Sequence, residues 1–209
     1  MSQQTEKALQ ARLDLVLERI ENPKFLKNDG LGNEVGFWIF DYPAQHELIV
    51  RENLEHIIDK LKKHDHHFEH INIFQILIDM LESRNLLDRT FKREKEVGTD
   101  ALRKTLAGPL SQDKVAKFIA DALLKNRSDA VPLDFVILSG LGNAWPLVRG
   151  HELLSALQDV MGSTPLILFY AGEYSGQDLH PFGMIESRNY YRAFKLVPED
   201  GNNNKHKAV

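Results

Sequence analysis

Two acidic residues at the ends of hydrophobic runs are the first candidates for chemistry in this 209-residue chain. Asp41 lies in the run Phe37-Trp-Ile-Phe-Asp-Tyr-Pro43, and Glu173 follows a second such run. A carboxylate at the end of a buried strand is well placed to act as a metal ligand or a general base. Structural roles are equally open to Asp41, because it can cap the next helix or pair with Arg51 or Arg149. Glu173 has the same two interpretations.

A Gly-x-Gly turn is the second feature that could bind a ligand. Gly140 and Gly142 follow a predicted strand and precede a predicted helix, where glycines let backbone N–H groups approach a phosphate. Trp145 stands where the dinucleotide fingerprint requires a third glycine, which favours an ordinary tight turn. The chain has no Gly-x-x-x-x-Gly-Lys-Ser/Thr, so a classical P-loop ATPase is excluded. A degenerate nucleotide-binding fold stays open.

Four histidines, His64, His66, His67 and His70, suggest a metal site by their residue type. His66 and His67 are adjacent, however, and adjacent side chains point apart on a helix or a strand. We therefore predict a solvated turn and no metal. The signatures of zinc proteases, β-lactamases and α/β-hydrolases are incomplete or absent.

Hydrophobic runs that alternate with amphipathic stretches must position these residues. Strands are predicted at 37–42, 68–73, 133–138, 165–170 and 190–197. Helices are predicted at 4–22, 45–63, 74–83, 112–126 and 146–160, with two short helices within 84–110 and a loop at 171–183. This alternation predicts an α/β fold, a three-layer sandwich with a mostly parallel central sheet of about five strands and helices on both faces. We expect residues 1–197 to form a single domain and 198–209 to form a disordered tail.

The carboxyl ends of parallel strands share one edge of the sheet, where ligands bind in such folds. We expect the segments 41–43, 139–143 and 172–176 to meet there. We predict that residues of these three segments, together with Arg149, form a crevice that binds a ligand or a partner. Its residues are Asp41, Tyr42, Pro43, Ser139, Gly140, Gly142, Asn143, Arg149, Glu173 and Tyr174.

The composition is that of a soluble globular domain, with 43% hydrophobic and 27% charged residues. The formal net charge of −4 disfavours direct nucleic-acid binding, although Lys60–Lys63 and Arg89–Lys95 offer local basic segments. The absence of cysteine excludes thiolate nucleophiles and fits a reducing compartment. The chain lacks a secretion signal and an apolar stretch of membrane-spanning length, so we expect a cytoplasmic location without a membrane.

Six short phrases of the sequence are distinctive: Phe37-Trp-Ile-Phe-Asp-Tyr-Pro43, Gly108-Pro-Leu-Ser111, Leu138-Ser-Gly-Leu-Gly142 with Trp145-Pro146, Thr164-Pro-Leu-Ile-Leu-Phe-Tyr170, Gly172-Glu-Tyr-Ser-Gly-Gln177 and Asn189-Tyr-Tyr-Arg-Ala-Phe194. Together they resemble the BrxB family of bacteriophage-exclusion (BREX) systems, and the likeness covers roughly residues 5–197. The resemblance implies a role in antiphage defence. It implies PglZ, the alkaline-phosphatase-like member of the same systems, as the direct protein partner, and it supplies no established catalytic residues.

Two functional hypotheses follow from these observations. The first is a non-enzymatic BREX component without a cofactor, an adaptor or regulator that binds a larger BREX protein, PglZ. It rests on the incomplete catalytic signatures and the acidic charge balance. The alternative is a degenerate nucleotide- or metal-binding enzyme that acts at the strand-end crevice around Asp41, Gly140 and Glu173.

Overall fold

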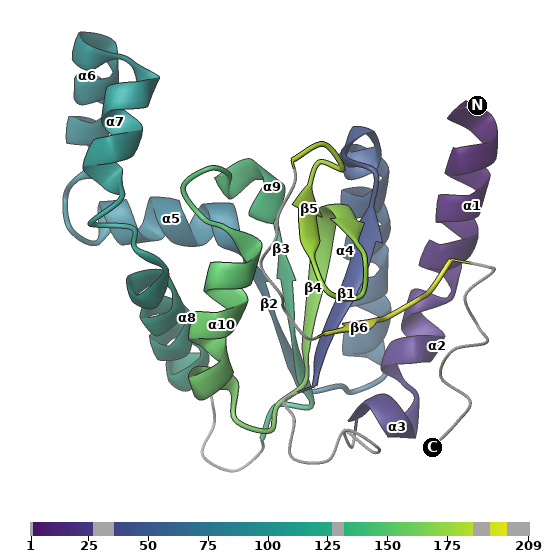
Figure 1. Ribbon diagram of the computed structural model, residues 1–209. Coiled ribbons are helices and arrows are strands. Elements are labelled where there is room, and N and C mark those ends of the chain that lie inside the picture. The colour runs from purple at the N-terminus through teal and green to yellow at the C-terminus, as the bar shows by residue number, and fades with distance from the viewer. Residues whose placement is uncertain (1, 27–35, 127–131, 186–192, 200–209) are drawn as a thin grey trace.

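A parallel β-sheet forms the centre of the molecule (Figure 1). The computed structural model describes residues 2–26, 36–126, 132–185 and 193–199. Within these ranges, parallel strands follow the order β2-β3-β4-β1-β6, and β5 pairs antiparallel with the end of β4. The strands are β1 (Phe37–Tyr42), β2 (Phe68–Asn72), β3 (Phe135–Ser139), β4 (Leu166–Tyr174), β5 (Leu179–Pro181) and β6 (Phe194–Lys195). The prediction of a mostly parallel α/β sheet is confirmed.

Helices cover both faces of this sheet, as predicted (Figure 1). One face carries α1 (Ser2–Asp14), α2 (Val16–Ile20), α3 (Pro23–Leu26) and α4 (Glu47–Lys63), which follows the short helix η1 (Ala44–His46). The other face carries α5 (Ile73–Glu82), α8 (Gln112–Asn126), α9 (Leu141–Ala144) and α10 (Gly150–Met161). The remaining helices, α6 (Leu87–Val97) and α7 (Thr99–Leu106), form a hairpin that projects from the body of the domain (Figure 1).

The central strands are buried on both sides, which explains their continuous apolar sequences. Side chains alternate between the faces of a strand. Phe40 and Tyr42 of β1 therefore pack in the core on the α4 side, whereas Phe37 and Ile39 pack in the core on the α10 side. β2 is an edge strand, and Ile71 is its only fully buried residue. This difference follows the sequence, since three of the five residues of β2 are polar: Glu69, His70 and Asn72.

Four predicted elements differ from the structure. The helix predicted at 4–22 is broken at Leu15. Pro23 begins α3 instead of only ending a helix, because proline fits the first turn, where the missing N–H is not needed. The helix predicted from 146 begins only at Gly150, after the separate turn of α9. The strand predicted at 190–197 is observed only as β6, and residues 186–192 lie outside the described residues.

The loop predicted at 171–183 is largely β-structure. β4 continues to Tyr174 and turns back into β5, and the two pair through Gly172 and Pro181. A side chain at position 172 would lie 2.3 Å from the carbonyl oxygen of His180. Glycine at this position marks a close approach of two backbones within a hairpin, which the sequence pattern does not distinguish from a loop.

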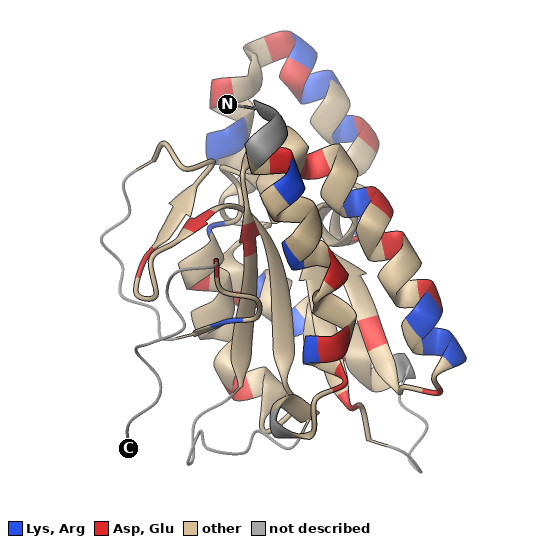
Figure 2. Ribbon diagram, turned by 90° about the vertical axis from the view of Figure 1, so that its right-hand side faces the viewer, with Lys and Arg blue, Asp and Glu red and all other residues tan. Residues whose placement is uncertain are grey.

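Charged residues of both signs cover the outer helices. Figure 2 shows Lys and Arg interspersed with Asp and Glu along the helices of one side. The two basic segments noted in the sequence, Lys60–Lys63 and Arg89–Lys95, lie at the end of α4 and on the projecting α6. They do not adjoin, because α4 ends at the amino edge of the sheet and α6 lies near its carboxyl edge (Figure 1). No helix in the described ranges is long and apolar enough to cross a membrane.

Candidate functional site

The connections of β1 and β4 create a topological switch in the sheet. These strands are neighbours, yet α4 follows β1 on one face while α10 precedes β4 on the other. Ligands of parallel α/β folds bind outside the carboxyl ends of the strands at such a point. Two depressions open there, and they are named here by their residues. The polar pocket includes Tyr42, Glu47, Arg51, His70, Asn72 and Ser139. The strand-end hollow includes Asp41, Pro43, Glu173, Phe182, Met184 and Lys195.

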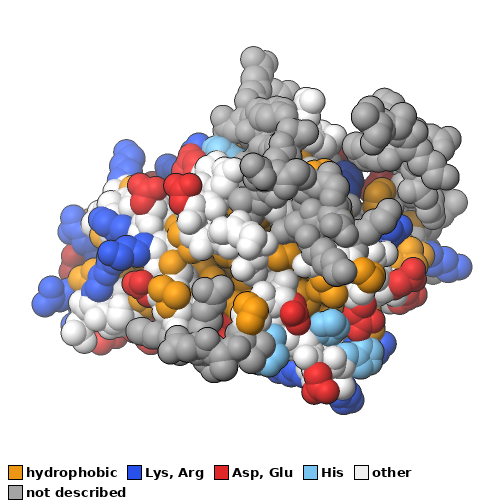
Figure 3. All heavy atoms as spheres, turned by 90° about the horizontal axis from the view of Figure 1, so that it is seen from below, with side chains coloured by type: hydrophobic (Ala, Val, Ile, Leu, Met, Phe, Trp, Pro, Cys, Tyr) orange, Lys and Arg blue, Asp and Glu red, His pale blue; other side chains and the backbone are white. Residues whose placement is uncertain are grey.

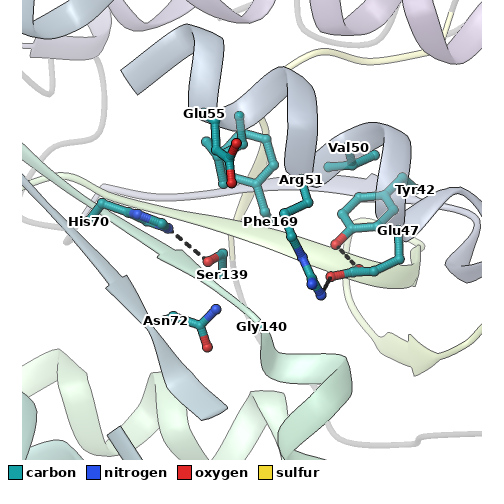
Figure 4. A pocket seen from close by; sticks show the side chains of 11 residues that line it. Tyr42, Glu47, Val50, Arg51, Glu55, His70, Asn72, Ser139, Gly140 and Phe169 are labelled. Atoms are coloured by element: carbon teal, nitrogen blue, oxygen red, sulfur yellow. Dashed lines mark hydrogen bonds and ion pairs between the residues drawn. The ribbon is translucent and has the colours of Figure 1, made fainter. Parts of the chain in front are cut away.

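One wall of the polar pocket is formed by the ends of β2 and β3 (Figure 4). His70 Nε2 lies 2.8 Å from Ser139 Oγ, within hydrogen-bond distance. Asn72 lies beside Ser139 in the strand register, and its Oδ1 accepts the backbone N–H of Gln75 at 3.2 Å, which caps α5. A Cβ atom on Gly140 would lie 2.4 Å from Asn72 Oδ1, so the glycine makes room for the Asn72 side chain.

The opposite wall of the polar pocket is formed by β1 and α4. The Tyr42 hydroxyl donates to Glu47 Oε2 at 2.6 Å, and Arg51 Nη2 donates to Glu47 Oε1 at 3.1 Å. Burial raises the pKa of Tyr42, and the Glu47 charge raises it further, so the hydroxyl stays protonated. Partial burial lowers the pKa of His70. The imidazole is therefore neutral at pH 7 and able to accept a proton.

Asp41 lies inside an ion-pair network, not at an open site. Its carboxylate is 3% exposed, and it accepts hydrogen bonds from Arg12 Nη2 at 2.7 Å and Lys195 Nζ at 3.0 Å. The backbone N–H of Tyr174 donates to it at 3.0 Å. Pairing of Asp41 with Arg51 or Arg149 is wrong, since Arg51 pairs with Glu47 and Arg149 Nη1 lies 3.9 Å from Glu152 Oε1. Asp41 joins α1, β1, β4 and β6, which is a structural role.

The strand-end hollow is an open depression of about 720 Å³ with an apolar rim. The rings of Trp145 and Phe182 meet edge to face with their centroids 5.6 Å apart. Met184 is 81% exposed. Phe182 has a φ of 58°, a left-handed conformation that costs a bulky residue free energy and that recurs at functional sites. Aromatic and methionine side chains at an exposed rim are typical of protein interfaces.

The histidine cluster at the opposite, amino edge of the sheet makes ion pairs. Glu21 Oε1 lies 2.5 Å from His64 Nδ1 and 3.5 Å from His66 Nε2, and Asp134 Oδ2 lies 3.5 Å from His66 Nδ1. Figure 3 shows histidines beside acidic side chains on the face seen from below. In the described part of the chain, no group of three or more His, Asp and Glu side chains is arranged to hold a metal ion.

The structure divides the predicted crevice among several places. The polar pocket receives Tyr42, Ser139 and Gly140, and the strand-end hollow receives Asp41, Tyr42, Pro43 and Glu173. Of the others, Gly142 lies near Phe182, Asn143 is exposed on α9, Arg149 lines a hollow beside α7 and α8, and Tyr174 is buried with its hydroxyl donating to Ala193. The residues Asp41, Gly140 and Glu173 therefore do not converge on one crevice.

Sequence reasoning missed most residues of the polar pocket, among them Glu47, Arg51, His70 and Asn72. His70 was grouped with the histidines next to it in the chain, whereas its side chain lies beside Ser139, 69 residues away. The available signal was the alternation within β2, which puts His70 and Asn72 on the same face near the end of a strand.

Comparison with known proteins decides the family. A family model described as BREX protein BrxB matches residues 69–196. The chain is 58% identical over 193 residues to the BREX protein BrxB of Escherichia coli O9:H4 (strain HS), an alignment that covers 92% of this chain and 94% of the relative. The chain belongs to the BrxB family. It is 35% identical over 191 residues to the BREX protein BrxB of Bacillus cereus (strain H3081.97), covering 89% of this chain and 96% of that relative.

The BrxB assignment confirms the resemblance drawn from the six phrases. It makes the chain a component of a BREX system, and such systems defend bacteria against phage. The BrxB family model spans β2, β3, β4, β5 and β6, and so includes His70, Ser139, Phe182 and Met184. No solved structure matches the chain significantly.

Proposed function

We propose that this BrxB protein acts in antiphage defence as an adaptor that binds PglZ of the same BREX system. Its membership of the BrxB family, over about nine-tenths of its length in the E. coli alignment, is the observation that carries the proposal. A component of a multi-protein defence system acts beside other proteins, and the family resemblance implies PglZ as the direct one. The exposed apolar side chains at the hollow support the adaptor role, because such patches mark interaction sites.

The strand-end hollow is the docking face in this proposal. Phe182 and Met184 line it, and Trp145 packs against Phe182; aromatic residues and methionine are enriched in protein interfaces. The charged residues at the hollow indicate which charge the partner surface carries. Asp41 is neutralised within the fold, whereas Glu173 and Glu199 are exposed at the hollow. The complementary surface of PglZ therefore presents an apolar side chain next to Arg or Lys.

The test is a binding measurement with separately purified PglZ. The wild-type chain is expected to co-elute with PglZ in size-exclusion chromatography at micromolar concentration. Met184→Ala and Trp145→Ala should each weaken binding by about 30-fold, the effect of losing about 2 kcal/mol at a central contact, and Glu173→Lys should weaken it through charge repulsion. Leu124→Ala is the matched control, because Leu124 is 61% exposed but lies on α8, away from the hollow.

The possible outcomes test two claims separately: that PglZ is the partner, and that the strand-end hollow is the docking face. Absence of a complex between wild-type protein and PglZ at micromolar concentration overturns the adaptor proposal. A complex that Met184→Ala, Trp145→Ala and Glu173→Lys leave unchanged overturns only the assignment of the docking face. Circular dichroism of each variant establishes that the protein is folded before binding is compared.

A further inference from the structure

We propose that Ser139 is a nucleophile, with His70 as its general base, in a site that hydrolyses esters of short acyl groups. This activity goes beyond the docking role and uses the polar pocket, which does not contain Trp145, Phe182 or Met184. Ser139 Oγ and His70 Nε2 lie 2.8 Å apart, the separation of a serine nucleophile and its base. Figure 4 shows the two side chains directed toward each other inside the pocket.

The fold brings this pair together at a rigid place. β2 and β3 are parallel and in register, with Asn72 opposite Ser139 and His70 opposite Ile137. His70 and Ser139 are thus diagonal neighbours on the same face of adjacent strands. Both lie near the carboxyl ends of the strands, so their side chains open toward the pocket instead of the core. A nucleophile held on strands keeps its position better than one on a loop.

His70 is in the protonation state that a general base needs. Partial burial lowers the pKa of its imidazole, Lys62 lowers it further, and Glu55 opposes this effect. The ring is therefore neutral at pH 7, and Nε2 accepts the serine proton when Nδ1 carries the ring hydrogen. A charged imidazolium in the same place would leave Ser139 without a base.

Asn72 supplies a hydrogen-bond donor beside the nucleophile. Its Oδ1 is engaged by the backbone N–H of Gln75, which fixes the orientation of the amide. Figure 4 shows the amide nitrogen on the side of Ser139 and the oxygen turned away. An asparagine amide directed at a developing oxyanion stabilises the tetrahedral intermediate of acyl transfer. Gly140 permits this placement, since a Cβ would lie 2.4 Å from Asn72 Oδ1.

The size and lining of the pocket define the substrate class. Its volume is about 110 Å³. This equals roughly four water molecules at about 30 Å³ each, enough for an acetyl- or propionyl-sized group. Val50, Leu54 and Phe169 supply apolar surface for the acyl carbons. A long acyl chain would extend out of this volume into solvent.

The reaction requires only the ester and water. Ser139 Oγ attacks the carbonyl carbon while its proton passes to His70 Nε2, and Asn72 donates to the oxyanion. The bond from the carbonyl carbon to the alcohol oxygen breaks, and the alcohol leaves with the proton from His70. Water then attacks the acyl carbon while its proton passes to His70 Nε2. The bond from the acyl carbon to Ser139 Oγ breaks, His70 returns the proton to Oγ, and the carboxylic acid is released. The sum is ester plus water giving acid plus alcohol.

A fluorophosphonate probe and p-nitrophenyl acetate test the proposal. The wild-type chain is expected to form one covalent phosphonyl adduct, located on Ser139 by peptide mass spectrometry, and to release p-nitrophenol. Ser139→Ala should lose the adduct and the turnover. His70→Gln should slow both by about 10²-fold or more, the usual loss on removal of a general base. Ser155→Ala is the control, because Ser155 is exposed on α10 away from the pocket, and it should react like wild type.

The result that overturns the proposal is a folded wild-type protein without an adduct on Ser139, or a His70→Gln variant that reacts at the wild-type rate. PglZ binding provides a separate readout, since Ser139→Ala should bind PglZ as wild type does. Failure of the chemistry therefore leaves the docking proposal intact, and failure of docking leaves the chemistry intact.

Discussion

Replacing Asp41 with asparagine should destabilise the fold strongly, because the carboxylate holds a buried network together. It is 3% exposed and accepts hydrogen bonds from Arg12, Lys195 and the backbone of Tyr174. A charged hydrogen bond contributes about 1.5–3 kcal/mol and a neutral one about 1 kcal/mol. Lys195 can turn toward water, since 25% of its side chain is exposed. Arg12 is buried and keeps only Glu199, an exposed carboxylate whose Oε1 lies 3.8 Å from Arg12 Nη1 and compensates its charge poorly. Breaking such a pair costs about 3–5 kcal/mol, so we expect a loss of about 4 kcal/mol.

Urea denaturation at pH 7 measures this loss as a lower midpoint with an unchanged slope. Two further variants isolate the cause. Lys195→Met should lower the free energy of unfolding by about 1 kcal/mol or less, because Asp41 keeps its ion pair with Arg12. Adding Arg12→Met to Asp41→Asn should recover part of the lost stability, since it removes the poorly compensated buried charge. A loss below about 1 kcal/mol for Asp41→Asn, or a double variant no more stable than the single one, would refute the reasoning.

Two other stability predictions follow. Phe135→Ala should cost about 3–5 kcal/mol in the same urea assay, because the ring is fully buried and packs edge-on against Phe25, whereas the control Phe91→Ala, at a 52% exposed position, should cost less than about 0.5 kcal/mol. His64 lowers the pKa of Glu21 below 4.5, so the carboxylate stabilises the fold above that pH and loses its effect as the pH falls through the lowered value. In thermal melts near pH 6, the wild type should therefore be more stable than Glu21→Gln by about 0.5 kcal/mol, and this stability difference should shrink as the pH falls below 4.5. A stability difference that does not change with pH would contradict this.

The sequence was sufficient to predict the layers of this fold but not the order of its strands. A strand buried on both faces is nearly continuous in its apolar residues, as in the first five residues of β4, and this pattern is visible without a structure. The position of β6 next to β1 depends on packing between segments far apart in the chain, for which the local pattern has no signal. The β4–β5 hairpin was missed for a related reason. Gly172 indicates a loop by its type, while its actual role is to admit the His180 carbonyl.

For the site, the sequence predicted that three segments follow strands at one edge of the sheet, but it did not predict which side chains share a depression. Consecutive residues of a strand point to opposite faces. Asp41 and Tyr42 therefore have different surroundings although they are neighbours: Asp41 joins the ion-pair network, whereas Tyr42 packs in the core on the α4 side. The link from His70 to Ser139 depends on the pairing of β2 with β3, so a motif search along the chain does not find it.

The alternation also explains how one strand edge can carry two separate functions. Met184 and Glu173 line the hollow, Ser139 lines the polar pocket, and the two linings share only Tyr42 among the described residues. Tyr42 lines both depressions, and its hydroxyl holds Glu47 on the pocket wall. A partner seated in the hollow therefore reaches the polar pocket most directly by displacing Tyr42. If PglZ docks there, the reactivity of Ser139 should change on binding through this residue, and Tyr42→Phe, which keeps the ring but releases Glu47, should reduce that coupling.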